Sequence, residues 1–221
     1  MPDCQDLYDF KCDIMIPFEQ RNFHKELLKE LDIIAKEEGA HVLLHSCCAP
    51  CSTVCIELLS QYMPVTVFYY NPNIDDEAEY RKRVEEEIRF IKEFPTKHKV
   101  DFIEGKHDVE SFYRIAAGRE DCKEGGQRCF LCYRLRLEET AKVAQSLKIP
   151  YFATTLTLSP MKKSFVLNKI GLALERFYDV KYLCSDFKKA GGFKRSLELS
   201  EQYCLYRQNF CGCKYSKTNE N

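Results

Sequence analysis

Three cysteine clusters are the feature of this 221-residue chain that can do chemistry. Thirteen cysteines are present, and seven of them fall into Cys47-Cys48-x-x-Cys51, Cys129-x-x-Cys132 and Cys211-Gly212-Cys213. Hydrophobic packing does not require paired thiols at these spacings. Metal coordination and redox chemistry do, because thiolates from separate segments must converge on one centre. The sequence therefore predicts a metal or redox site built from these clusters.

The first two clusters can supply four thiolates to one site. Cys47 and Cys48 are adjacent, and a loop can turn both toward a cluster of several irons more easily than toward one ion. Cys129 and Cys132 form a C-x-x-C pair at a predicted helix start, where free amides and the helix dipole stabilise thiolates. Four thiolates suit a cubane iron–sulfur cluster and a structural zinc site equally well.

The third cluster offers a different chemistry. Cys211 and Cys213 can chelate one metal or close a strained, redox-active disulfide, and Gly212 permits the tight bend between them. With Cys51 as a third ligand, a metal would keep an open coordination position. An open position distinguishes catalytic from structural metals.

Other residues near these clusters have less specific interpretations. Cys55 and Cys122 lie close enough in sequence to act as substitute ligands for the first and second clusters. Cys184 follows a predicted strand and Cys204 falls in a predicted helical stretch, so we interpret both as small core residues. His45 ends a buried strand and is interpreted as a hydrogen-bonded core histidine.

Alternating strands and helices must position the clusters. Apolar and β-branched runs predict strands at 41–45, 65–70, 99–103, 151–156 and 181–184. Helical spacing predicts intervening helices, which include 76–94, 109–117 and 132–147 and two helices capped by Ser52 and Ser164. This rhythm predicts an α/β fold with an open, mostly parallel sheet and helices on both faces. Ligands bind at the carboxyl ends of such strands, directly where Cys47 and Cys48 follow the first strand.

Composition limits the class of protein and its partners. Lys and Arg total 33 against 34 Asp and Glu, so any nucleic-acid site must be a local patch. No apolar run approaches the roughly 18 residues of a membrane span, and the start lacks a signal-peptide pattern, so we expect no membrane partner and a cytoplasmic, thiol-reducing location. Candidate phosphate-binding residues are Lys162, Lys163, Lys188, Lys189, Lys194, Arg195 and Arg207.

The chain divides into three parts on this reading. Residues 1–40 are expected to be an N-terminal extension with one helix, and they carry Cys4 and Cys12. Residues 41–216 are expected to form one α/β metal-cluster domain. Residues 217–221 are expected to be a frayed tail.

Seven ordered motifs between residues 41 and 216 carry a family resemblance. They are HSCCAPC (45–51), FYYNPNI (68–74), EYRKR (79–83), GGQRCFLC (125–132), TTLTLSP (154–160), FKKAGGFKRS (187–196) and YRQNFCGCKYS (206–216). In this order they resemble the QueH-type epoxyqueuosine reductases. The resemblance implies a sheet of the adenine nucleotide α-hydrolase-like (HUP) class, in agreement with the predicted alternation.

The same resemblance implies an activity and a set of cofactors. Family members remove the epoxide oxygen of epoxyqueuosine at the tRNA wobble position, the last step of queuosine biosynthesis, without cobalamin and with electrons from an external donor. By motif, Cys47, Cys48, Cys129 and Cys132 would hold a [4Fe-4S] cluster. The catalytic residues would be the ligands of a second, mononuclear iron, for which zinc can substitute in purified protein: Cys51, Cys211 and Cys213.

Some assignments stay open at this level. The position of Cys51 can be an aspartate in relatives, and Cys211 with Cys213 can instead be a redox-active disulfide. Rival classes are a zinc-stabilised RNA-binding module, a thiol–disulfide oxidoreductase and an ATP-dependent tRNA sulfur-insertion enzyme. The last is disfavoured because the first loop carries cysteines where such enzymes place a glycine- and serine-rich phosphate loop.

Overall fold

A five-stranded parallel sheet forms the centre of the computed structural model, which describes residues 18–216. The expected irregular start with Cys4 and Cys12, and the expected frayed tail, lie outside the described residues. The strands follow the order β3-β2-β1-β4-β5, and each neighbouring pair is parallel. Their bounds are β1 (Val42–Ser46), β2 (Val65–Tyr69), β3 (Val100–Glu104), β4 (Tyr151–Thr154) and β5 (Lys181–Tyr182).

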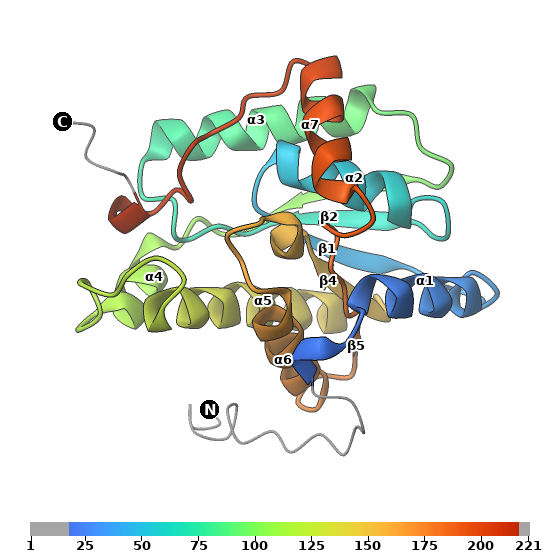
Figure 1. Ribbon diagram of the computed structural model, residues 1–221, viewed down its shortest axis with the longest axis horizontal. Coiled ribbons are helices and arrows are strands. Elements are labelled where there is room, and N and C mark those ends of the chain that lie inside the picture. The colour runs from blue at the N-terminus through green and yellow to red at the C-terminus, as the bar shows by residue number, and fades with distance from the viewer. Residues whose placement is uncertain (1–17, 217–221) are drawn as a thin grey trace.

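Helices cover both faces of this sheet. In Figure 1, α2, α3 and α7 lie on one side, and α5 and α6 lie on the other. The predicted open α/β fold is therefore confirmed. No helix among the described residues combines the length and apolar character needed to cross a bilayer. The helices are α1 (Phe23–Ile34), α2 (Ala49–Leu59), α3 (Glu77–Glu93), α4 (Val109–Ala116), α5 (Gln127–Leu147), α6 (Ser164–Glu175) and α7 (Gly192–Gln202).

The central strand β1 separates two hydrophobic cores. Successive side chains of a strand point to opposite faces. Val42 and Leu44 accordingly join the core that includes residues of α1 and α2, whereas Leu43 joins the core beneath α5 and α6. Because both faces are covered, every residue of β1 and β2 is buried. This burial explains why the two strands are continuous apolar runs in the sequence.

The strand order creates a crevice beside the first cysteine cluster. The chain winds from β1 through β2 to β3, and then returns to place β4 on the other side of β1. Loops that leave neighbouring strands in opposite directions open a crevice at the carboxyl ends of the strands. Cys47 leaves β1 at this point, and its backbone N–H donates to Thr155 Oγ1 after β4 at 3.3 Å.

Strand ends depart from the sequence prediction where side chains intervene. The strand predicted at 151–156 ends at Thr154, because Thr154 Oγ1 accepts a hydrogen bond from the Leu156 backbone N–H at 3.1 Å. The chain then forms the 3₁₀ helix η2 (Thr155–Leu158). Two further 3₁₀ helices are η1 (Phe18–Gln20) and η3 (Lys214–Ser216), and β5 contains only two residues.

The predicted caps of two helices are wrong. Cys48, and not Ser52, occupies the N-cap of α2, and Ser52 Oγ donates to the Ala49 carbonyl inside the helix at 3.0 Å. Lys163 is the N-cap of α6, whereas Ser164 begins the helix and donates to Asp186 Oδ2 at 2.9 Å. In both places the serine hydroxyl has another partner, so the helix begins elsewhere.

Gly171 tests the packing of α6 on the sheet. A Cβ at this position would lie 2.4 Å from the ring of Tyr182, which is 2% exposed and has no room to move aside. We expect Gly171→Ala to lower the free energy of unfolding by about 1–3 kcal/mol through overpacking. Urea denaturation of the variant and of the parent protein measures this loss. An unchanged midpoint would show that the Tyr182 ring yields to the methyl group.

Candidate active site

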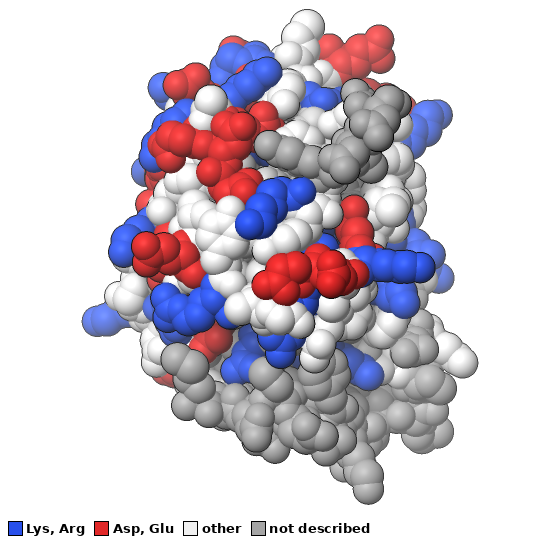
Figure 2. Space-filling view, turned by 90° about the vertical axis from the view of Figure 1, so that its left-hand side faces the viewer, with Lys and Arg blue, Asp and Glu red and all other residues white. Residues whose placement is uncertain are grey.

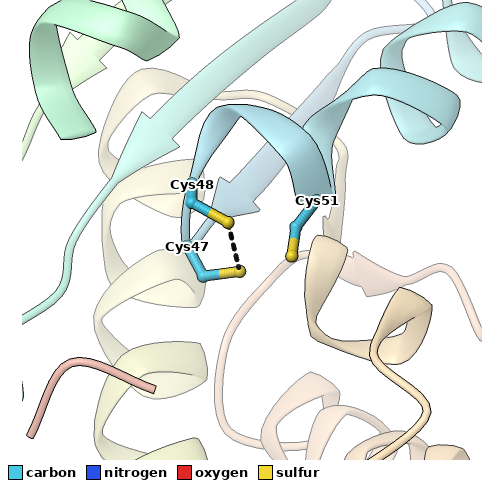
Figure 3. A group of neighbouring side chains, drawn as sticks. All are labelled: Cys47, Cys48 and Cys51. Atoms are coloured by element: carbon cyan, nitrogen blue, oxygen red, sulfur yellow. Dashed lines mark hydrogen bonds between the residues drawn. The ribbon is translucent and has the colours of Figure 1, made fainter. Parts of the chain in front are cut away.

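Three thiols converge where β1 passes into α2. Figure 3 shows the sulfurs of Cys47, Cys48 and Cys51 turned toward one another. Their sulfur atoms all lie within 4.8 Å of one another, and those of Cys47 and Cys48 are 3.8 Å apart. The backbone at Cys48 is extended, and the helix begins at Ala49. This change of direction brings two adjacent cysteines to the same centre, next to the positive end of the helix dipole.

The second cluster lies in the first two turns of α5. This helix begins at Gln127, earlier than the predicted 132, so both Cys129 and Cys132 are helical. Cys129 Sγ accepts a hydrogen bond from the Gly125 backbone N–H at 3.3 Å. Cys132 is buried in an apolar cluster that also contains Cys213. One member of the second cluster and one member of the third are therefore packed together.

A pocket of about 380 Å³ joins the first and third clusters. Cys47 and Cys51 line it from one side, and Cys211 lines it from the chain segment after α7. Lys162 and Arg136 contribute positive charge to the same wall. The pocket and the apolar cluster of Cys132 and Cys213 thus bring together members of all three predicted clusters.

The other cysteines have separate environments. Cys55 is buried in the first core, and its thiol donates to the Cys51 carbonyl at 3.3 Å. Cys184 is buried in the second core, as predicted. Cys204 is exposed, so its assignment to the core is wrong. It follows the end of α7 with φ of +50°, in a turn and not within a helix. Cys122 lies in the loop before α5.

One buried cation, Arg136, and one partly buried cation, Lys162, face the converging thiols. Burial alone would lower the pKa of Arg136, but Cys132, Cys47 and Cys211 attract its charge and raise the pKa overall. Lys162 behaves in the same way: burial opposes its charge, whereas Cys211 and Cys47 favour it and leave a raised pKa. Both side chains therefore remain cationic, and they can compensate thiolate charge at this site.

Arg136 is held by residues at the ends of three strands. The side chain is 1% exposed and donates to Asn71 Oδ1 and, at 3.2 Å, to His45 Nε2. His45 Nδ1 lies 2.9 Å from Thr154 Oγ1, and Nε2 lies 3.2 Å from the Tyr70 carbonyl oxygen. Burial, with Arg136 as a smaller cause, lowers the His45 pKa to about 3. The prediction of a hydrogen-bonded core histidine is confirmed.

The third cluster belongs to a segment that crosses α3. We call residues 203–213 the strap. The Arg83 guanidinium, 2% exposed, donates to the Cys211 carbonyl at 3.3 Å and lies 5.2 Å from the Phe210 ring centre. Glu79 holds Arg83 in an ion pair at 2.6 Å and accepts a hydrogen bond from Tyr206 Oη at 2.9 Å. One ion pair on α3 therefore fixes two points of the strap.

Further contacts fix the strap at both of its ends. Arg89 donates to the Tyr203 carbonyl at 2.9 Å, and the Tyr206 backbone N–H donates to Glu86 at 2.6 Å. Gly212 has φ of +115°, and a Cβ there would lie 2.7 Å from Ile74 Cγ1. Glycine is needed at this position for both conformation and space.

A protonated carboxyl lies below the first cluster. Glu87 is fully buried on α3 and accepts a hydrogen bond from Ser46 Oγ at 3.0 Å. Burial raises its pKa to about 8, and hydrogen bonding with Ser52 and Ser46 offsets this rise only partly. The carboxyl is consequently neutral in the folded protein near neutral pH.

Hydrogen bonding among the thiols concentrates negative charge on one sulfur. Bonds from Cys48 and Cys51 lower the pKa of Cys47 well below its usual value. The same bond to Cys47 raises the pKa of Cys48 to about 12, and bonds to Cys47 and Cys48 raise that of Cys51. Burial raises the pKa of Cys132 to about 12. A metal that bound here would therefore have to displace protons from most of these thiols.

Sequence reasoning missed three buried charged residues. Arg83 and Glu87 lie among Tyr80 and Val84 on the buried side of α3, three or four residues apart. Charged residues on an otherwise apolar helical stripe were the available signal. Arg136 follows Cys132 by four residues and so shares its helical face.

Comparison with known proteins decides the family. The profile described as Epoxyqueuosine reductase QueH matches residues 42–219, which is most of the chain. This chain belongs to the QueH epoxyqueuosine reductase family. QueH proteins are oxidoreductases that perform the last step of queuosine biosynthesis. The profile covers all three cysteine clusters and the strap.

Individual relatives support the same membership. The chain is 39% identical over 205 residues to Epoxyqueuosine reductase QueH of Streptococcus pyogenes serotype M1, which covers 91% of this chain and 80% of that protein. The protein of the same name from Staphylococcus epidermidis is 38% identical, with 88% and 84% covered. That of Staphylococcus aureus is 40% identical, with 79% and 75% covered. The family resemblance inferred from the motifs is confirmed.

The Arg83 contacts predict a loosened strap when the guanidinium is removed. A charge-assisted hydrogen bond contributes about 1.5–3 kcal/mol, so Arg83→Met should accelerate local opening by roughly tenfold or more. Hydrogen–deuterium exchange across residues 203–213 and the alkylation rate of Cys211 measure this opening.

Arg81→Met is the matched control for this experiment. Arg81 lies on the same helix, but it is about half exposed and pairs with Glu77 and Glu104. The control should leave exchange in the strap unchanged. Equal exchange rates in the Arg83 variant and the parent QueH would disprove the anchoring role.

Glu87 predicts a pH dependence of stability. The folded state keeps the Glu87 proton up to about pH 8, whereas the unfolded chain releases it near the ordinary value of 4.5. Between these values the unfolded state binds fewer protons, so stability falls as pH rises, by up to about 1.4 kcal/mol per pH unit. Glu87→Gln should flatten this decline. Urea midpoints of metal-free protein at pH 5 and pH 8 test it, and an equal decline in both proteins would contradict it.

Proposed function

We propose that this QueH protein reduces epoxyqueuosine within tRNA, at the wobble position, with a [4Fe-4S] cluster and an adjacent iron. Four thiols would hold the cluster: Cys47, Cys48, Cys129 and Cys132. The second metal would be held by Cys51, Cys211 and Cys213, which we propose as the catalytic residues. Zinc can take the place of this iron in purified protein. Electrons would come from an external donor in the cytoplasm, and residues 41–216 would form the reductase domain.

One observation carries this proposal: Cys47, Cys51 and Cys211 line the same pocket beside two cations, the buried Arg136 and the partly buried Lys162. The donor set fits thiophilic metals, because three sulfurs already lie within 4.8 Å of one another. When bound, such centres supply electrons at low potential and a Lewis-acid position for an oxygen atom. Arg136 and Lys162 would offset the charge that accompanies reduction.

The pocket also suits the substrate. Its volume of about 380 Å³ can receive one modified base that has left the stack of the anticodon loop. Phe193 and Phe210 supply apolar wall, and Lys162 supplies a cationic hydrogen-bond donor for the epoxide oxygen. Removing that oxygen as water consumes two electrons and two protons and leaves a carbon–carbon double bond.

Anaerobic purification tests the cofactor proposal. We expect a brown protein with about five irons and four acid-labile sulfides per chain, or four irons and one zinc. A colourless protein that contains only zinc would favour a zinc-stabilised RNA-binding module. Turnover by metal-free protein would favour a thiol–disulfide oxidoreductase that uses Cys211 and Cys213.

Serine variants test the division of ligands between the two metals. Cys211→Ser or Cys213→Ser should abolish turnover and leave the cluster absorbance largely intact, whereas Cys48→Ser should remove that absorbance. Cys204→Ser is the matched control, because this thiol is exposed and follows α7 outside the pocket. Loss of the cluster in the Cys211 variant would show that the proposed division is wrong.

A further inference from the structure

A second pocket, of about 470 Å³, adjoins the cysteine pocket. Pro160 and Lys162 line both pockets, so the two are neighbours along one wall. The lining of the second pocket contains one acidic residue, Asp186, and five basic residues. These are Arg21, Lys162, Lys163, Lys188 and Lys189. We call this the basic pocket.

Three distant segments build the basic pocket. Arg21 precedes α1, Lys162 and Lys163 precede α6, and Lys188 and Lys189 precede α7. The sheet brings these segments together, since the last two follow its neighbouring strands β4 and β5. The whole chain has a net charge of -1, so the basic pocket does not reflect an overall excess of positive residues. The fold gathers these cations from three separate segments.

Internal contacts make one wall of the basic pocket rigid. Asp186 accepts hydrogen bonds from Ser164 Oγ at 2.9 Å and from Lys188 Nζ at 2.7 Å. Lys188 Nζ also lies 3.3 Å from the Thr157 carbonyl oxygen, to which it donates. Lys163 and Lys189 are exposed at the rim. The wall is thus fixed, and the rim lysines can move to meet an anion.

The seven basic residues that the sequence suggested as phosphate-binding lie in different parts of the structure. Four of them line the basic pocket, together with Arg21, which the sequence did not suggest. Arg195 forms an ion pair with Glu57 at 2.6 Å, and Lys194 Nζ lies 4.0 Å from a carboxylate oxygen of Glu198. Neither residue lines the basic pocket. Arg207 lines the cysteine pocket and donates to Ser200 Oγ at 3.1 Å.

We propose that the basic pocket binds the phosphodiester backbone of the RNA strand next to the nucleotide whose base enters the cysteine pocket. This inference rests on the proposed function, in which tRNA is the substrate. Phosphates favour clustered lysine and arginine, and the start of the twelve-residue helix α6 adds backbone dipoles of the right sign. Phe165 in the same lining offers a ring on which an unpaired base can stack.

The local position of these cations favours this role over general attraction of polyanions. On the face drawn in Figure 2, the coloured residues show basic and acidic side chains interspersed. A balanced surface gives little steering at long range, so affinity must come from contacts made beside the active site. Backbone contacts of this kind would orient the strand and carry no sequence information.

Binding of a fluorescent tRNA transcript to the anaerobically purified protein tests the proposal. Lys163→Glu with Lys189→Glu should weaken binding on the order of tenfold near 150 mM salt and lower the slope of log K against log salt by about one per lysine. Lys29→Glu with Lys36→Glu is the matched control, because it makes the same change in net charge and both lysines are exposed and line neither pocket. It should bind tRNA as the parent protein does.

The outcomes separate this inference from the proposed function. Weaker binding with a lower salt slope in the double variant, but not in the control, supports the basic pocket, provided that the iron and sulfide content is unchanged. Unchanged binding, or equal weakening in the control, overturns the basic pocket while reductase turnover still supports the proposed function. A parent protein that neither binds nor reduces tRNA would overturn both.

Discussion

Repulsion among thiolates is the constraint that the rest of this structure must satisfy. Members of all three cysteine clusters lie near one another, and their charges can share this region only if opposite charges lie close by. Arg136 is buried and Lys162 partly buried beside them, and the first turns of α2 and α5 point positive dipole ends at them. At Cys132, burial outweighs the attraction of Arg136 and raises the pKa of the thiol to about 12.

The need for compensating cations also explains polar residues in the sheet. A buried guanidinium needs acceptors, and Arg136 finds them at His45 and Asn71, just where β1 and β2 end. His45 is in turn fixed by Thr154, the last residue of β4. The polar residues that interrupt these apolar strands are therefore part of the site, although none of them is proposed to touch a metal. Helix α3 extends the same support to the strap through Arg83 and Glu79.

Sequence patterns predicted the features that depend on near neighbours. Strands β1, β2 and β3 and the alternation with helices followed from runs and periodicities of residues, and the cysteine clusters were visible as spacings. The ion pair that holds Cys211 was not predictable in this way, because Arg83 lies on another element, far away in the sequence. The helix starts at Ala49 and Gln127 were also missed, since Ser52 bonds within its helix and no side chain caps α5. Arg21 joined the basic pocket only through the fold.

The dependence of the strap on α3 has a consequence for biogenesis. Of the three cysteine clusters, Cys211 and Cys213 leave the ribosome last, when the strands and helices before them are already available for folding. The nascent protein can thus present Cys47, Cys48, Cys129 and Cys132 before the strap arrives. If both proposed metals are bound, the order of translation would separate their loading in time, and the second would wait for the strap to dock against Arg83.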